Sequence, residues 1–394
     1  MLTKEIFIVG AARTAIGTYG GTLKDVPMTQ LAATVVREAL KRSSVAADRV
    51  GHVVMGNVIP TEPRDAYLAR VAAIEAGIPV KVPAFNVNRL CGSGLQAIVS
   101  AAQSLLLGDA EVAIGGGAES MSRGPYILPT ARWGARMGDV QTVDYMLGIL
   151  HDPFHKIHMG ITAENVAARD GITREMQDEL ALESQRRAVA AIAEGRFASQ
   201  IVPVEIQSRK GVQLFDTDEH VRRDVTLEQL AKMKPAFKPD GTVTAGNASG
   251  LNDGAGAVVL ATADAVQSGN LRPLARLVSY AHAGVDPKVM GVGPVPATRL
   301  ALERAGLRVS DLDVIESNEA FAAQACAVTR TLELDPAKVN PNGSGISLGH
   351  PVGATGAIIT IKAIHELQRT GGRYALATMC IGGGQGIAAI FERV

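Results

Sequence analysis

The chain of 394 residues contains few cysteines and no excess of charge of either sign. Its three cysteines form no CxxC pair, so neither a disulfide framework nor a structural zinc site is expected. Lys plus Arg and Asp plus Glu both number 39, and this balance provides no global field favouring nucleic acid or an anionic membrane. The apolar run at residues 6–9 is too short for a signal-peptide core or a membrane span. We therefore expect a globular cytoplasmic enzyme.

Several chemical motifs are also missing. No GxGxxG follows the first expected strand, and no GxxxxGK[ST] occurs, so a dinucleotide-dependent dehydrogenase and a P-loop nucleotide site are excluded. No HExxH or comparable ligand cluster is present, and no metal is predicted. A polyanionic small molecule could still be held by a local basic patch.

Strand-like and helix-like segments alternate along the chain. Strands are predicted at 6–11, 50–55 and 111–114, and helices at 29–42 and 94–107, because the apolar residues recur with the corresponding periods. This alternation predicts an α/β protein with parallel sheets covered by helices on both faces. The length allows two or three domains or subdomains.

The second half of the chain repeats the first. Asn88 to Gly94 opens a helix that leads to a strand and a glycine run, and residues 340–356 open a corresponding segment before Gly382-Gly383-Gly384. We predict a first half at 1–121 completed by about 249–273, and a second half at 274–394. Two such units can pack face to face, so that their facing loops share a site.

Between the halves, residues 122–248 contain more charged residues. We interpret this segment as an insertion that covers the shared site. Within it, residues 216–223 are predicted to form a solvated loop.

Cys91 is the first candidate nucleophile. It lies between the strand-like run at 84–87 and the helix that begins near Gly92. A thiol at a helix N-terminus experiences the positive end of the helix dipole, which favours the thiolate, and the small residues after it leave backbone N–H groups free for an oxyanion. A buried, inert cysteine is the alternative that the local sequence leaves open.

His350 and Cys380 are the candidates for proton transfer. His350 lies in a glycine-rich turn, where a neutral imidazole could accept the proton of Cys91, although a surface turn histidine has the same pattern. Cys380 could move a proton to or from carbon, or could be a core cysteine at a strand end. Cys326 is expected to be a core residue.

Asn318 and Ser249 have two possible roles each. The Asn318 amide could hold a water molecule or donate to an oxyanion, whereas an N-cap role is the structural alternative. Ser249 could contact a ligand or occupy a turn.

Five motifs in this order and spacing resemble the thiolase family over essentially the whole chain: Cys91-Gly92-Ser93-Gly94, Gly246-Asn247-Ala248-Ser249-Gly250, Asn318-Glu319-Ala320-Phe321, Gly349-His350-Pro351-Val352-Gly353-Ala354-Thr355-Gly356 and Cys380-Ile381-Gly382-Gly383-Gly384. The resemblance is greatest to bacterial biosynthetic β-ketothiolases (acetyl-CoA acetyltransferases) of broad specificity that serve polyhydroxyalkanoate synthesis. It implies two α/β halves packed as a five-layer α-β-α-β-α sandwich with an inserted loop domain.

The resemblance also implies a reversible ping-pong Claisen condensation. Cys91 would carry the acyl group with His350 as its base, and Cys380 would remove the α-proton of the second acyl-CoA. One oxyanion hole would use His350 and a water held by Asn318, and the other the N–H groups of Cys91 and Gly382. Coenzyme A is then substrate and product, and no other cofactor is implied.

The remaining implied contacts concern coenzyme A and assembly. The coenzyme A and thioester contacts would come from Arg222, Phe237, Ala245, Ser249, His158, Met159, Ala320 and Phe321. A homotetramer is implied, with residues 122–139 at the tetramer contact. The stretch 151–157 differs from acetoacetyl-specific relatives and is expected to border the acyl pocket, so we predict that propionyl-CoA is accepted as primer.

Three other functions were considered. A degradative 3-ketoacyl-CoA thiolase of β-oxidation has the same motifs. A malonyl-decarboxylating condensing enzyme shares the fold but lacks a second cysteine, so Cys380 argues against it. A non-catalytic acyl-CoA or lipid-binding protein would not need Cys91, His350, Asn318 and Cys380 together.

Overall fold

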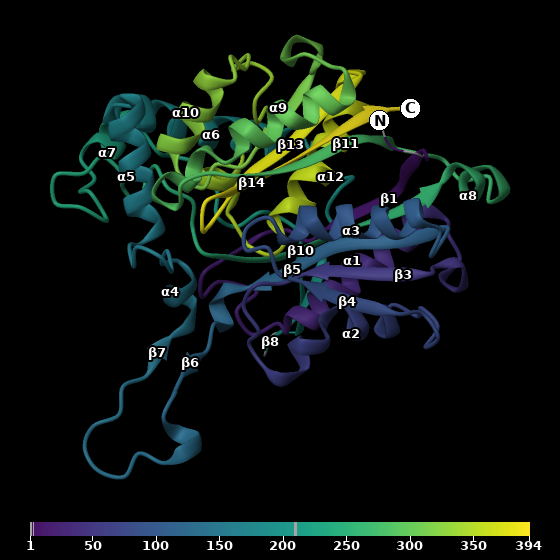
Figure 1. The fold of residues 1–394 in the computed structure, drawn as a ribbon, viewed down its shortest axis with the longest axis horizontal. Coiled ribbons are helices and arrows are strands. Elements are labelled where there is room, and N and C mark those ends of the chain that lie inside the picture. Colours follow the sequence, from purple (N-terminus) through teal and green to yellow (C-terminus); the bar gives the residue numbers. More distant parts are fainter. Residues whose placement is uncertain (1, 3, 209–210) are drawn as a thin grey trace.

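The computed structural model describes residues 2, 4–208 and 211–394, and it contains two similar α/β halves with an insertion (Figure 1). The first half contains β1 (Ile6–Arg13), β2 (Gly17–Thr18), α1 (Met28–Ser43), β3 (His52–Gly56), α2 (Leu68–Glu75), β4 (Ala84–Val87), α3 (Ser93–Leu107), β5 (Val112–Ser120), β10 (Asn252–Thr262) and α8 (Ala263–Ser268). The second half contains β11 (Ala275–Gly284), α9 (Pro294–Ala305), β12 (Val314–Ser317), α10 (Ala322–Thr331), α11 (Gly345–Leu348), α12 (Thr355–Thr370), β13 (Tyr374–Ile381) and β14 (Gln385–Arg393).

The main strands follow the order β12-β13-β14-β11-β1-β10-β5-β3-β4. The two halves join where β1 pairs with β11 through Phe7 and Ile8. Helices α1 and α2 cover the outer side of the first half, α9 covers the outer side of the second, and α3 and α12 lie between the halves. The predicted five-layer α-β-α-β-α arrangement is therefore confirmed.

The predicted parallel sheets are wrong for most strand pairs. Among the strands of the described residues, only β3–β4, β3–β5 and β12–β13 pair parallel, while the central strands pair antiparallel. One cause is the glycine turn that joins β13 directly to β14, because so short a connection requires antiparallel pairing. The first glycine run, Gly115-Gly116-Gly117, lies inside β5 rather than at its end.

Helices α3 and α12 cross at two glycines. A Cβ on Gly94 would lie 2.7 Å from the Ala357 nitrogen, and a Cβ on Gly356 would collide with the Leu95 backbone. The close approach places the start of α3, after Cys91, beside the start of α12, after His350. Among the described residues, one segment (Leu90–Leu107) is apolar and long enough to cross a membrane, but 67% of it is buried inside the protein, as in a core helix.

The insertion contains β6 (Tyr126–Ile127), β7 (Val143–Asp144), α4 (Tyr145–Ile149), α5 (Met159–Asp170), α6 (Arg174–Ala193), β8 (Val204–Ser208), β9 (Gly211–Phe215) and α7 (Leu227–Ala231). Its helices α5 and α6 pack against α10 of the second half. Its β6–β7 arm projects away from the body of the molecule, at the lower left of Figure 1. The arm exposes 86% of Trp133 and 96% of Met137.

Candidate active site

Cys91 is held in a tight turn between β4 and α3. Leu90 has a φ of 46°, a left-handed conformation that is rare for a side chain of this size. The turn is fixed because the Asn88 Oδ1 accepts from the Leu90 N–H at 2.9 Å, while the Ser93 Oγ accepts from the Arg89 N–H and donates to the Leu90 carbonyl. Local hydrogen bonds therefore maintain a strained turn that presents the thiol to one side.

The prediction that Cys91 favours the thiolate is wrong for the resting protein. Burial raises the pKa of the Cys91 thiol to about 11, although the Gly382 N–H and the N–H of Cys91 itself donate towards the sulfur and lower it. Removal of the thiol from water outweighs the helix-terminus effect. The nucleophile is consequently stored as a neutral thiol.

His350 lies between the end of α11 and the start of α12, and its ring is almost fully buried. The Thr355 Oγ1 lies 2.7 Å from the Nδ1 of His350 and donates its single proton to the Pro351 carbonyl at 2.9 Å. The hydroxyl can therefore only accept from the imidazole, so we assign the Nδ1–H tautomer. Burial lowers the pKa of His350 to about 4. The ring is a neutral base with its lone pair at Nε2.

Asn318 follows β12 and lies behind His350. Its Nδ2 is 3.5 Å and 3.4 Å from the two ring nitrogens, so the amide faces the ring without a directional bond to either. Its buried Oδ1 has no hydrogen-bond partner among the described residues. The N-cap alternative is wrong, because α10 begins only at Ala322 with Phe321 as its cap.

Cys380 is the penultimate residue of β13 and is buried. Burial raises the pKa of this thiol, and the neighbouring Cys91 raises it further. The turn that follows needs glycine, because Gly383 and Gly384 have φ values of 78° and 82°. Gly382 directs its N–H towards Cys91, so both thiols and a backbone donor meet at one point.

One cavity of about 390 Å³ collects nearly all the predicted site residues. All of them except Asn318 line it: Cys91, His350, Cys380, Gly382, Arg222, Phe237, Ala245, Ser249, His158, Met159, Ala320 and Phe321. The described residues include no group of three or more His, Cys, Asp or Glu side chains that could hold a metal ion.

The insertion forms the aromatic wall of this cavity. The His158 ring stacks on Phe237 with centroids 4.7 Å apart, and Phe237 meets Phe321 edge-on at 6.1 Å. The His158 Nδ1 accepts from the Gly160 N–H, so its Nε2 carries the proton. Ser249 donates its backbone N–H to Ala320 at 3.0 Å, which joins the two halves at this wall.

Arg222 lines the cavity but extends from an anchored loop. The prediction that 216–223 is a solvated loop is wrong at its centre, where Asp218 forms a fully buried ion pair with Arg13 at 2.8 Å. Glu219 accepts from Thr18 and Thr22, and His220 is largely buried with its pKa lowered to about 4 by burial. These contacts fix the backbone from which Arg222 extends.

The sequence analysis missed the apolar end of the cavity. Its lining includes Val58, Leu90, Leu147, Ile149, Leu150, Leu251, Met290 and Val352. The predicted border 151–157 is wrong, since none of those residues lines the cavity; His151 only meets the edge of His158, at 5.1 Å between ring centroids. These apolar residues come from distant segments, and each alone has the pattern of ordinary core. Thr355 was missed as well, although its position five residues after His350, at the first residue of α12, was a usable signal.

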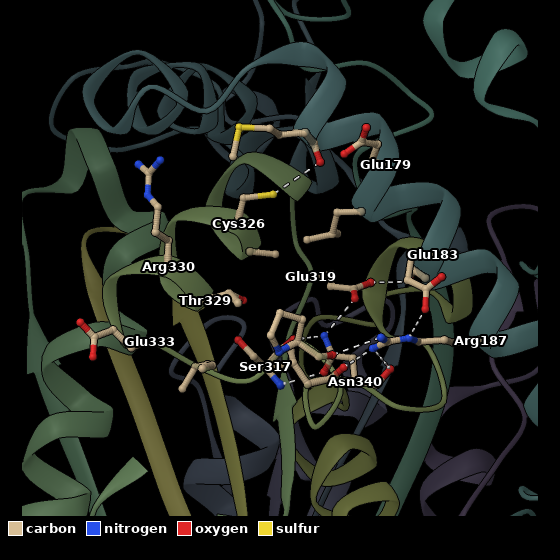
Figure 2. Close-up of a pocket in the computed structure, with 17 residues that line it drawn as sticks. Glu179, Glu183, Arg187, Ser317, Glu319, Cys326, Thr329, Arg330, Glu333 and Asn340 are labelled. Carbon is tan, nitrogen blue, oxygen red and sulfur yellow. Dashed lines mark hydrogen bonds and ion pairs between the residues drawn. The ribbon is translucent and has the colours of Figure 1, made fainter. Parts of the chain in front are cut away.

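A second cavity, of about 540 Å³, lies between α6 and α10 (Figure 2). Cys326 lines it and donates to the Met176 carbonyl at 3.7 Å. It packs against the core cluster of the second half, as predicted, but is only half-buried. Glu319, at the base, accepts from Asn340 at 2.9 Å and from Ser184 at 2.6 Å. Because Glu319 adjoins Asn318, these bonds fix the segment that carries the Asn318 amide.

The chain was compared with known proteins and structures. Residues 6–264 match the thiolase N-terminal domain, and residues 271–393 match the thiolase C-terminal domain. The chain is 70% identical to Beta-ketothiolase BktB of Cupriavidus necator over the full length of both, and 51% identical to an acetyl-CoA acetyltransferase of Pseudomonas aeruginosa over 99% of this chain and 100% of that protein. The crystal structure of human mitochondrial 3-ketoacyl-CoA thiolase in complex with CoA has a TM-score of 0.97 at 47% identity, covering 100% of this chain and 99% of that chain.

Proposed function

Because the chain belongs to the thiolase family, we propose that it is an acetyl-CoA acyltransferase that condenses two acyl-CoA molecules to a 3-ketoacyl-CoA and coenzyme A, and catalyses the reverse thiolysis. The observation that carries this proposal is the meeting of Cys91, His350 and Cys380 in one cavity with an N–H donor from Gly382. Two thiols and one neutral base suit a reaction with an acyl-transfer step and a carbon-deprotonation step.

In the first step the Cys91 sulfur attacks the thioester carbonyl of acetyl-CoA while His350 Nε2 accepts the thiol proton. Coenzyme A leaves and takes its proton from Cys380. This leaves an acetyl group on Cys91, a protonated His350 and a Cys380 thiolate, so the site has given one proton to coenzyme A and its net charge is unchanged. The N–H groups of Cys91 and Gly382 stabilise the oxyanion that forms on the acyl carbonyl.

In the second step the Cys380 thiolate removes the α-proton of another acetyl-CoA. A raised thiol pKa suits this role, since a more basic thiolate is better matched to a carbon acid. The enolate attacks the acetyl group on Cys91, and the departing Cys91 sulfur recovers its proton from His350. A water bound by the unpartnered Asn318 Oδ1, together with His350, would stabilise the enolate oxygen.

The coenzyme A arm is assigned to the wall formed by the insertion. Arg222 provides a cation for phosphate, while Phe237, Ala245 and Ser249 provide a narrow path for the pantetheine chain towards the thiols. The crystal structure of human mitochondrial 3-ketoacyl-CoA thiolase in complex with CoA supports coenzyme A as the ligand class.

The apolar end of the cavity supports a substrate range beyond acetyl groups. Val58 and Val352 line the cavity and belong to one apolar cluster, against which Leu90 and Cys91 pack. A propionyl group on Cys91 gains buried apolar area there, at about 0.8 kcal/mol for its additional CH₂. We therefore propose that propionyl-CoA is accepted as primer, giving 3-oxovaleryl-CoA.

We also propose a homotetramer that acts in the cytoplasm and supplies 3-ketoacyl-CoA for polyhydroxyalkanoate synthesis. For assembly, two features support the proposal: β4 forms one edge of the sheet and exposes Phe85, and the β6–β7 arm exposes Trp133 and Met137. Unpaired strand edges and exposed apolar arms are typical protein-contact surfaces.

The test follows the magnesium-enolate absorbance of acetoacetyl-CoA after addition of coenzyme A. We expect rapid loss with the parent and near-complete loss of activity in Cys91→Ser and in Cys380→Ser. Condensation of propionyl-CoA with acetyl-CoA tests the substrate range. A folded but inactive parent would support the binding-protein alternative, whereas an active Cys380→Ser variant would contradict the second step above.

The degradative thiolase alternative is distinguished by chain length. An enzyme of β-oxidation should cleave long 3-ketoacyl-CoA substrates at least as well as acetoacetyl-CoA. Because the cavity is only about 390 Å³ and must also hold the end of the pantetheine arm, we expect thiolysis to decline as the acyl chain lengthens.

A further inference from the structure

Glu119 accepts hydrogen bonds from both halves of the protein, next to residues that line the active-site cavity. It is the penultimate residue of β5 and is fully buried. Its Oε1 accepts from Asn57 Nδ2 at 2.8 Å and from the Ile59 N–H at 3.1 Å, while its Oε2 accepts from the Val58 N–H at 3.0 Å and from the Gly353 N–H at 2.9 Å. Three donors belong to the first half and one, Gly353, belongs to the second.

The four donors come from the two loops that form the site. Val58, in the loop after β3, lines the apolar end of the cavity. Gly353 follows Val352, which lines the same end, and lies three residues after His350. A single carboxylate therefore ties the loop that carries the imidazole to the half that carries the nucleophilic thiol.

Close packing leaves Gly353 no alternative position. A Cβ on Gly353 would lie 2.5 Å from the Glu119 Oε2 and 3.0 Å from the Asn57 Cα, and a Cβ on Gly117 would collide with the Gly353 carbonyl. Backbone thus lies against backbone at this junction. A shift of the Glu119 carboxylate would move the Gly353 loop with it, since protein interiors have little free volume.

The bonding pattern fits an ionised carboxylate. Burial raises the pKa of Glu119 to about 8, with the N–H groups of Ile59, Val58 and Gly353 acting in the opposite direction, so the ionised form is assigned from its hydrogen-bond donors. Every donor that reaches the two oxygens is an N–H group, so a carboxyl proton would face a donor and displace it. The catalytic steps described above give Glu119 no proton to transfer.

We propose that Glu119 is a positioning residue that holds the His350 loop at the correct distance from Cys91, through its bond to Gly353. The proposal rests on the proposed function, because it concerns the thiol–imidazole step of that reaction. Glu119 is too deeply buried to touch the substrate, so its effect on catalysis passes through the Gly353 loop.

The test measures kcat and KM for acetoacetyl-CoA thiolysis in Glu119→Gln and Glu119→Asp. Gln directs an amide NH₂ at one of the N–H donors, and Asp is one CH₂ too short to reach Gly353 and the 57–59 loop together. We expect kcat to fall about tenfold or more in both variants, because misplacement of a catalytic group affects the chemical step. We expect KM to change less than about threefold, because the coenzyme A wall is separate.

The matched control is Glu164→Gln. Glu164 is another buried carboxylate that accepts backbone N–H bonds, from Thr242 and Val243, but these hold the coenzyme A side of the cavity near Thr244. We expect this variant to raise KM and leave kcat nearly unchanged. A folded Glu119→Gln enzyme with the parent kcat overturns the proposal. An equal fall of kcat in Glu119→Gln and in the Glu164→Gln control overturns it as well. An inactive parent instead overturns the proposed function.

A second measurement needs no variant. Hydrogen exchange of the Gly353 amide in the parent, resolved at single residues, should be as slow as that of the core amides of β5, because its acceptor is fully buried. Exchange at the rate of an open loop would overturn the proposal even if no Glu119 variant folds.

Discussion

At the scale of single residues, the site stores its reactive groups in neutral form. Burial raises the pKa of Cys91 to about 11 and lowers that of His350 to about 4, so at neutral pH neither the thiolate nor the imidazolium is populated in the resting protein. Thr355 complements this state, because it fixes the tautomer in which Nε2 can accept a proton. Proton transfer from Cys91 to His350 is therefore unfavourable in the resting protein.

This neutral pair predicts how Cys91 responds to pH. Because its pKa is raised, the thiolate fraction is small at pH 7 and grows about tenfold per pH unit up to the pKa. We expect the rate of Cys91 alkylation by iodoacetamide to rise by this factor from pH 7 to about pH 10, without a plateau. Mass spectrometry of the Cys91 peptide measures the rate, with Cys91→Ser as the unlabelled control. A plateau already reached at about pH 7 would instead indicate a preformed thiolate–imidazolium pair.

The predictable part of the site is the part that lies in short motifs. Cys91, His350 and Cys380 each carry a recognisable glycine-rich frame, so their chemistry could be read from the sequence. The raised pKa of Cys91 could not, because it depends on burial by residues such as Val58 and Val352 that are distant in sequence. Glu119 gave no signal for the same reason: its four donors come together only in the fold.

At the scale of elements, the α3–α12 crossing brings the two catalytic segments together. The helices could be predicted from their apolar period, since an amphipathic pattern is local. Their crossing at Gly94 and Gly356 could not be predicted, because neither helix sequence indicates which other helix it packs against. The same limit explains the wrong strand directions, which depend on which strands become neighbours.

The crossing predicts a large effect for one small substitution. Gly356→Ala places a Cβ against the Leu95 backbone, which cannot move without displacing α3. We expect a loss of about 1–3 kcal/mol in the free energy of unfolding, and more if the helices must separate. Urea denaturation measures the change.

Gly148→Ala is the control for this prediction. Gly148 lies in α4, and a Cβ there would meet no atom within 4 Å. We expect this change to be neutral or to stabilise the protein by about 0.5–1 kcal/mol, because alanine favours the helix. An equal loss in both variants would mean that glycine flexibility, and not the close approach of two helices, is what matters at Gly356.

At the scale of the whole molecule, the β6–β7 arm projects from the body and leaves large apolar side chains exposed to solvent. It is joined to the body through the short strands β6 and β7 and α4 (Figure 1). The large apolar side chains exposed within residues 126–137 include Tyr126, Leu128, Trp133 and Met137. The exposure of this apolar surface to water is unfavourable. A second copy of the chain is the partner that the proposed tetramer provides for it.

The protein contains its own reporter for this contact, because Trp133 is its only tryptophan. If the arm is buried in a tetramer, Trp133 emission should be blue-shifted at high protein concentration and shift to the red on dilution, together with a fall in mass by light scattering. Trp133→Ala with Met137→Ala should lower the mass to that of a dimer, because loss of two buried side chains of this size costs several kcal/mol per arm, about 1.5–3 kcal/mol or more each. Phe85→Ala at the β4 edge should act on the dimer instead. A tetramer that persists in the arm variant, or Trp133 emission that remains red at every concentration, would exclude the arm from the contact and leave the β4 edge as the remaining surface for assembly.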